Sequence, residues 1–215
     1  MPAVTAPSPP PRGTRGRSWR SAPFVALDFE TTGLDYRRDE VVSFGAVPVR
    51  AGRVVVGGAI HQLVAAAVPS STASLRIHEL LPKDLHGAPG PDRASELLRA
   101  ALDRAYLLAW YAEVELAFLR RTVGRSARWW ARRTIDVREL AIAVEDADPR
   151  NRFGLSATAE RYGIPVANPH EALDDAMVTA QLFLVLASRL EGRGVRTVRH
   201  LVRVSRRGGG PRARS

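Results

Sequence analysis

The feature that most constrains the fold is a short apolar run that ends in two acids, at residues 23–34 (PFVALDFETTGL). Its length and its proline boundary predict a buried β-strand over residues 23–29. Side chains alternate between the two faces of a strand, so Asp28 and Glu30 project to the same side. Paired carboxylates on a buried strand repel each other unless a cation lies between them. The run predicts a cation site, with simple solvent exposure of the strand end as the alternative.

A second acidic motif, HEALDDA, begins at His170, about 140 residues further along the chain. The hydrophobic spacing predicts a helix over residues 171–190, with Asp175 about one turn inside it. His170 lies just before this helix, and an imidazole beside a carboxylate site can accept a proton near neutral pH. The alternative is a solvated helix start, where the helix dipole favours acids.

A third acid, Glu115, falls in the first turn of a helix predicted over residues 112–123, directly after a buried strand at residues 105–110. Considered alone, it is typical of a surface helix. Glu113 is the competing candidate, but it points to nearly the opposite face of the same helix.

The remaining pattern predicts one α/β domain. The predicted strands cover residues 23–29, 41–49, 54–64, 105–110 and 134–135, and the predicted helices cover residues 91–104, 112–123, 137–144, 155–162 and 171–190. Three successive strands followed by alternating strands and helices predict a mixed five-stranded sheet. It would have an antiparallel meander, then parallel strands, and helices at its sides.

Charge is concentrated at the two ends of the chain, whose net charge is +10. Residues 1–22 carry four arginines and residues 192–215 carry eight, and neither stretch holds an acid. Their composition predicts disordered basic tails at residues 1–21 and 205–215 around a folded domain at residues 22–204. The cationic ends favour nucleic acid as a partner, with improved solubility as the alternative role.

Composition also excludes several classes of site. The chain has no cysteine, which rules out disulfides and thiolate metal sites, so oxygen or imidazole must hold any metal. No signal-peptide or membrane-spanning pattern is evident, and we expect a soluble cytoplasmic protein. His61 and His200 stand apart from the acidic motifs and are interpreted as structural or solvated. The pair Trp129-Trp130, among four arginines, is either a base-stacking surface or a packed aromatic pair.

In this order, the motifs resemble those of the DEDDh family of 3′–5′ exonucleases, which includes proofreading subunits of bacterial replicative polymerases, ribonuclease T and oligoribonuclease. The resemblance runs from about residue 24 to residue 190, with DFETTGL as the first motif and HEALDDA as the third. The second motif departs from the family. Where relatives have His-Asn-Ala and then Asp, this chain has Trp110-Tyr111-Ala112 and then Glu115.

The resemblance implies a ribonuclease H-like fold and two divalent ions, Mg²⁺ or Mn²⁺, held by Asp28, Glu30, Glu115 and Asp175. His170 would take a proton from the attacking water. The residues implied to contact substrate are Thr31, Thr32, Gly33, Leu34 and His78, although ordinary core packing is an equal alternative for Leu34.

The implied reaction releases nucleoside 5′-monophosphates from the free 3′ end of single-stranded or frayed DNA. A DNA polymerase or a repair complex is the implied protein partner. Two alternatives remain open: trimming of RNA by the same chemistry, and a catalytically weakened nucleic-acid-binding relative, which the altered second motif would explain.

Overall fold

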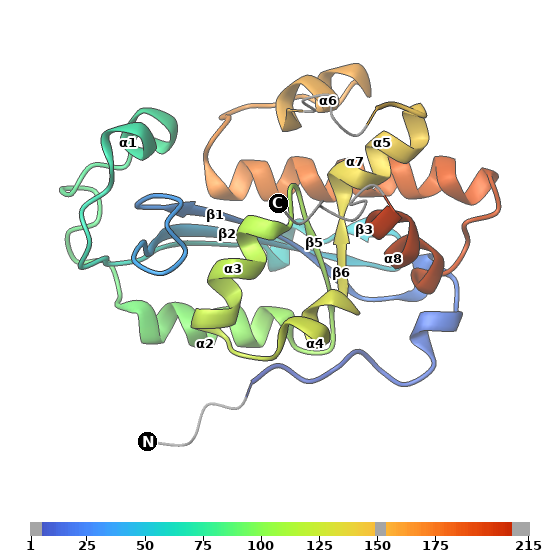
Figure 1. The fold of residues 1–215 in the computed structure, drawn as a ribbon, viewed down its shortest axis with the longest axis horizontal. Helices are drawn as coiled ribbons and strands as arrows, with labels where there is room; N and C mark the ends of the chain where they lie inside the picture. Colours follow the sequence, from blue (N-terminus) through green and yellow to red (C-terminus); the bar gives the residue numbers. More distant parts are fainter. Residues whose placement is uncertain (1–5, 149–153, 208–215) are drawn as a thin grey trace, which may run out of the picture.

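A computed structural model describes residues 6–148 and 154–207, and its strands form one mixed sheet (Figure 1). The strands are β1 (Phe24–Thr31), β2 (Val41–Arg50), β3 (Arg53–Val54), β4 (Ile60–Leu63), β5 (Tyr106–Ala109) and β6 (Thr134–Asp136). Their order is β3-β2-β1-β5-β6, with β4 also paired to β2. β1 runs antiparallel to β2 and parallel to β5, and β5 is parallel to β6. The predicted fold class is confirmed.

The sheet has six strands rather than the predicted five. The difference lies in residues 54–64, which the pattern predicts as one strand. There the 3-10 turn η3 (Val56–Gly58) separates β3 from β4. Gly57 and Gly58 fall in this turn, and adjacent glycines weaken an extended strand because they have no side chain to pack.

Helices cover both faces of the sheet (Figure 1). They are α1 (Thr72–His78), α2 (Pro91–Leu102), α3 (Glu113–Thr122), α4 (Ala127–Ala131), α5 (Val137–Glu145), α6 (Leu155–Arg161), α7 (Ala172–Gly192) and α8 (Val198–Arg207). The five predicted helices correspond to α2, α3, α5, α6 and α7, each within two residues at either end. The helices α1, α4 and α8 lie where no helix was predicted.

β1 is the central strand, and it separates two hydrophobic clusters. Phe24 and Ala26 pack into the cluster that includes α5, α7 and α8, whereas Val25 and Leu27 pack into the cluster under α2, α3 and α4. Asp28 continues the alternation of Phe24 and Ala26. The strand therefore directs its carboxylates to the face that α7 covers.

The described parts of the two predicted tails pack against the domain. Trp19, in the short 3-10 turn η2 (Trp19–Ser21), is fully buried, and its ring meets Phe183 edge-on at 5.6 Å between centroids. Its amide donates to the Arg196 carbonyl at 3.1 Å. α8 continues through residue 207 because Val198, Leu201 and Val202 form a buried stripe at helical spacing. Residues 1–5 and 208–215 lie outside the described residues.

Within residues 6–148 and 154–207, every helix is too short or too polar to cross a lipid bilayer.

Candidate active site

Three carboxylates from the first and third motifs meet beside β1. Ligand oxygens of Asp28, Glu30 and Asp175 lie within 4.8 Å of one another. The two β1 acids are two residues apart and share a face, as the alternation requires. The pairing of β1 with β2 shifts register between Glu30 and Thr31. An irregularity of this kind ends regular pairing and is common beside functional sites.

Asp175 reaches this cluster because α7 begins directly on the sheet at Gly45, which pairs with Asp28 across β1 and β2. A Cβ atom at residue 45 would lie 2.1 Å from the carbonyl oxygen of Ala172, the first residue of α7. Only glycine permits this approach without displacing backbone. Gly45 thus sets the distance between the carboxylates of β1 and the first turn of α7.

His170 lies at the entrance to α7, with its side chain exposed and its backbone in the left-handed region at φ 64°. Its amide donates to Asp175 Oδ2 at 3.2 Å. Burial raises the pKa of Asp175, while this hydrogen bond and the charge of the His170 imidazole oppose the rise. The imidazole therefore lies near enough to Asp175 to influence the pKa of that carboxylate.

Glu115 projects inward from the first turn of α3, with 3% of its surface exposed. It lies outside the group of three, yet its charge is one of the causes that raise the pKa of Asp28. Glu113 is exposed and lines a different cavity, between α3, α4, β6 and α8. The structure therefore brings Glu115, and not Glu113, to the other acids.

The four carboxylates repel one another strongly. Burial, followed by the charges of the other three acids, raises the pKa of Asp28 well above its ordinary value. Burial and the charge of Asp175 raise the pKa of Glu30 to about 8. Burial also raises the pKa of Glu115, with Asp136 and Glu30 adding to it and a backbone amide opposing it. Such a cluster is stabilised by cations that neutralise it.

The donor set fits hard divalent ions. Oxygen Oε2 of Glu115 and oxygen Oδ1 of Asp175 are buried with no hydrogen-bond partner among the described residues. Buried carboxylate oxygens without partners are costly, and coordination to a metal ion satisfies them. Carboxylate oxygens are the ligands that Mg²⁺ and Mn²⁺ prefer.

Hydrogen bonds between its own residues hold the loop at the end of the first motif in place. The Thr32 hydroxyl donates to Asp39 Oδ1 at 2.9 Å, and the Thr31 hydroxyl donates to the Gly33 carbonyl at 2.8 Å. Gly33 leaves room for the Asp39 carboxylate, which a Cβ atom would meet at 2.4 Å. The side chains of Thr31 and Thr32 thus shape the loop.

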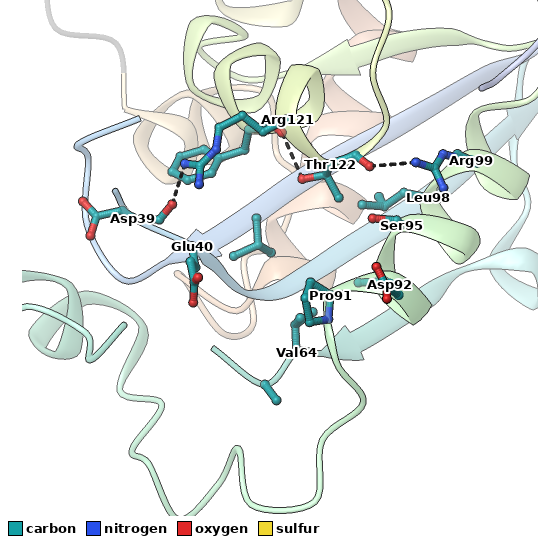
Figure 2. Close-up of a pocket in the computed structure, with 14 residues that line it drawn as sticks. Asp39, Glu40, Val64, Pro91, Asp92, Ser95, Leu98, Arg99, Arg121 and Thr122 are labelled. Carbon is teal, nitrogen blue, oxygen red and sulfur yellow. Dashed lines mark hydrogen bonds between the residues drawn. The ribbon is translucent and has the colours of Figure 1, made fainter. Parts of the chain in front are cut away.

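Arg121 of α3 also holds this loop, and Figure 2 shows its contact with Asp39 beside a cavity of about 400 Å³. Arg121 donates to the carbonyls of Tyr36 and Asp39, both at 2.8 Å. The loop presents Leu34 to solvent with 68% of its surface exposed. The core-packing alternative for Leu34 is therefore wrong, and its side chain is free to contact a ligand.

His78 ends α1 beside the first motif. The Ser71 amide, at the start of α1, donates to the Thr32 carbonyl at 2.8 Å and joins the helix to the site loop. Burial lowers the pKa of His78, and the Thr31 backbone opposes that change. Because only 8% of the His78 surface is exposed, this side chain faces the protein rather than solvent.

Sequence reasoning missed Asp136, at the end of β6. Its carboxylate accepts from the amides of Tyr111, Ala112 and Arg138 at 3.3, 2.9 and 3.0 Å. Burial raises its pKa to about 6, and those amides oppose the rise. Tyr111 has φ 63°, an uncommon conformation for an aromatic residue. Asp136 thus holds the strained turn that leads into α3 and Glu115. The acid directly before a predicted helix was the available signal.

His61 was interpreted as structural, apart from any acid. It lies between Ser43, whose hydroxyl is 3.1 Å from its Nε2, and Glu171, whose carboxylate is 3.9 Å from its Nδ1. Ser43 pairs with Glu30, and Glu171 immediately precedes α7. His61 therefore links the sheet to the start of α7, a contact across distant residues that the sequence pattern did not reveal.

The sequence pattern of the family described as Exonuclease (RNase_T) matches residues 25–183, which include all four carboxylates and His170. The chain belongs to this exonuclease family. Membership confirms the predicted resemblance to DEDDh 3′–5′ exonucleases and the predicted enzyme class.

Curated relatives agree with the family. The exonuclease is 31% identical over 179 residues to DNA polymerase III PolC-type of Thermotoga petrophila, covering 83% of this chain and 13% of that protein. It is 32% identical over 177 residues to a DNA polymerase III subunit epsilon-like protein of Rhodobacter capsulatus, covering 81% and 25%. The chain thus spans a quarter or less of the length of these relatives.

Solved structures agree with the fold. Exonuclease X in complex with 5′ overhanging duplex DNA has a TM-score of 0.65 at 20% identity, covering 85% of this chain and 99% of that one. Exonuclease I of E. coli in complex with a dA16 oligonucleotide has a TM-score of 0.69 at 15% identity, covering 80% and 42%.

Proposed function

We propose that this exonuclease is a metal-dependent enzyme that removes nucleoside 5′-monophosphates from the 3′ end of single-stranded or frayed DNA. The observation that carries the proposal is the meeting of Asp28, Glu30 and Asp175 within 4.8 Å, with Glu115 buried beside them. DNA is favoured over RNA because the polymerase III relatives act in DNA synthesis by name, and Exonuclease X is bound to duplex DNA.

The metal site would use the four carboxylates, with Asp28, Glu30 and Asp175 as the main ligands and Glu115 assisting. Divalent ions bound there supply positive charge that stabilises a phosphoryl group under attack and lowers the pKa of water. Two ions, Mg²⁺ or Mn²⁺, are the number and kind that we propose.

His170 is the proposed general base. Its exposed imidazole lies at the start of α7 near Asp175, where it can take a proton from an attacking water molecule. Leu34 stands exposed at the tip of the neighbouring loop and is the proposed contact for the terminal base. Apolar contact with a base tolerates any sequence, as an end-trimming enzyme requires.

The test uses 5′-labelled single-stranded DNA and RNA of one sequence, with Mg²⁺, Mn²⁺ or a chelator, and compares the chain with its Asp28→Asn variant. We expect DNA ladders that shorten from the 3′ end, require metal and vanish in the variant. Preference for RNA would replace the DNA proposal with RNA trimming. Binding without any ladder under either metal would contradict catalysis and favour a weakened relative.

The setting that we propose is a DNA polymerase or a repair complex, because the matched relatives include DNA polymerase III proteins. Co-purification with a tagged replicative polymerase, compared with an unrelated tagged protein, tests this partner.

A further inference from the structure

Three stretches of sequence without an acidic residue meet on one side of the fold. They are residues 1–27, 116–135 and 192–215. In their described parts, the 3-10 turn η1 (Thr14–Gly16) packs against α8, and α8 packs against β6. The side chain of Arg206 on α8 also bonds to the carbonyl of Ala131 on α4. These contacts gather arginines from all three stretches on one surface, although Arg20 and Arg193 pair with Glu191 and Asp146.

A cavity of about 350 Å³ opens in this surface, where the N-terminal segment crosses the starts of β5 and β6. Figure 1 shows that segment running past α4, away from the first turn of α7. The cavity is lined by Tyr106, by residues 9–11 and 13, and by four arginines, which are Arg12, Arg15, Arg132 and Arg133. No acid is among its lining residues. We call this group the arginine cavity.

The positive charge of the arginine cavity is not compensated. Arg12, Arg15 and Arg132 are exposed, and none of them forms a salt bridge with an acid among the described residues. Burial lowers the pKa of Arg133, Tyr106 opposes this change, and three neighbouring arginines add to it. Like charges held together in this way repel one another, and a bound anion would relieve that repulsion.

Stacking holds part of this cluster in place. The guanidinium of Arg133 lies 4.3 Å from the ring centre of Trp129 and donates to the Trp129 carbonyl at 3.2 Å. Arg125 lies 5.3 Å from the same ring and donates to the Pro7 carbonyl at 2.7 Å, which ties the N-terminal segment to the turn before α4. The tryptophan pair is thus a packed support for guanidinium groups, and two of its stacking positions are already occupied.

The arrangement fits a phosphodiester backbone. Guanidinium groups bind phosphate oxygens through paired donors, and cations spread over several elements suit a chain of regularly spaced phosphates. Residues Phe24 and Tyr106 pair across β1 and β5, so the cavity is level with the start of β1. Glu30 is six residues further along β1, roughly 20 Å away at about 3.3 Å per residue. That span corresponds to about six nucleotides of a stacked strand, at about 3.4 Å each, and to fewer nucleotides of an extended strand.

We propose that the arginine cavity is a second nucleic-acid site, which holds the phosphodiester backbone several nucleotides from the 3′ end in the carboxylate cluster. The proposal rests on the proposed exonuclease function for the position of that end. The binding of a backbone by the cavity is a separate property, and it can be measured without cleavage.

The binding test uses the full chain carrying Asp28→Asn, in chelator, with labelled single-stranded DNA of about 20 nucleotides across a series of salt concentrations. One variant adds Arg12→Gln, Arg15→Gln and Arg132→Gln. A control with the same change in charge adds Arg53→Gln, Arg93→Gln and Arg189→Gln, which lie on β3, α2 and α7. We expect the cavity variant to bind at least about 10-fold more weakly than the control. Its slope of log affinity against log salt should be smaller by about 2, since each phosphate contact contributes about 0.7.

A length test places the site. In the otherwise active chain, the cavity substitutions should lower kcat/KM for the long DNA about 10-fold and change that for a trinucleotide less than about twofold. Affinity and salt slope equal to those of the control would overturn the proposal. So would an equal loss on the trinucleotide, or stronger competition by an acidic peptide than by DNA of equal charge, which would indicate a protein partner. A chain with no hydrolytic activity would defeat the proposed function, while the binding test would still decide the cavity.

Discussion

Gly45 and Ala172 are in such close contact that a methyl group on the glycine would lie 2.1 Å from the alanine carbonyl oxygen. This contact brings β2 and the first turn of α7 together across more than 120 residues of sequence. It is the reason that Asp175 reaches the carboxylates of β1.

Gly45→Ala should therefore separate α7 from the sheet. We expect a loss of about 1–3 kcal/mol or more in the free energy of unfolding, because overpacking against backbone cannot be relieved by a rotamer change. Exonuclease activity should fall by more than the fraction of unfolded protein explains, since Asp175 moves with α7. Thermal unfolding and nuclease assays check this. Gly57→Ala is the matched control, because a Cβ atom there meets nothing within 4 Å. Equal behaviour of the two variants would contradict the role of Gly45.

The repulsion in the carboxylate cluster should make the metal-free protein less stable as pH rises. The folded state raises the pKa of Glu30 from 4.5 to about 8, so it retains a proton that the unfolded chain releases. The free energy of unfolding should decline as pH rises through that interval and then level off. Mn²⁺ or Mg²⁺ should raise the melting temperature most at the upper end. Melting curves in chelator and in metal test this, and a chelated protein that gains stability with pH would exclude it.

Glu115 and Glu113 offer a paired test of the second motif. Glu115→Gln should lower exonuclease activity at least about 10-fold and weaken metal dependence, because it removes a charge buried beside Asp28. Glu113→Gln should stay within about twofold, since Glu113 is exposed and lines a different cavity, between α3, α4, β6 and α8. Rates measured across a metal titration distinguish the two. Similar losses of activity in both variants would mean that activity depends on the packing of helix α3 rather than on the Glu115 carboxylate.

His170→Ala should lower kcat about 10²–10⁴-fold, as expected for loss of a general base. KM and the melting temperature should change little, because the His170 side chain is exposed and only its backbone amide bonds to Asp175. His200→Ala, an exposed histidine on α8, is the control. A large drop in melting temperature for His170→Ala would point to a structural role instead.

The parts of the fold that sequence reasoning predicted are those with strong local signals. β1 is an apolar run with a clear proline boundary and α7 has a long helical pattern. The acids of the first and third motifs lie at positions where strand and helix geometry directs them inward. α8 was missed because its arginines obscured a buried stripe of Val198, Leu201 and Val202. Asp136, His61 and Gly45 were missed because their roles arise from contacts between distant elements, which periodicity does not encode.

The burial of Trp19 against Phe183 has a practical consequence for anyone who shortens this chain. A truncation at residue 22, which the arginine- and proline-rich composition would suggest, removes an indole that fills part of the interior. It would also leave the Arg196 carbonyl without its donor. The truncated protein would therefore have an internal cavity beside α7, at the position that the Trp19 indole fills.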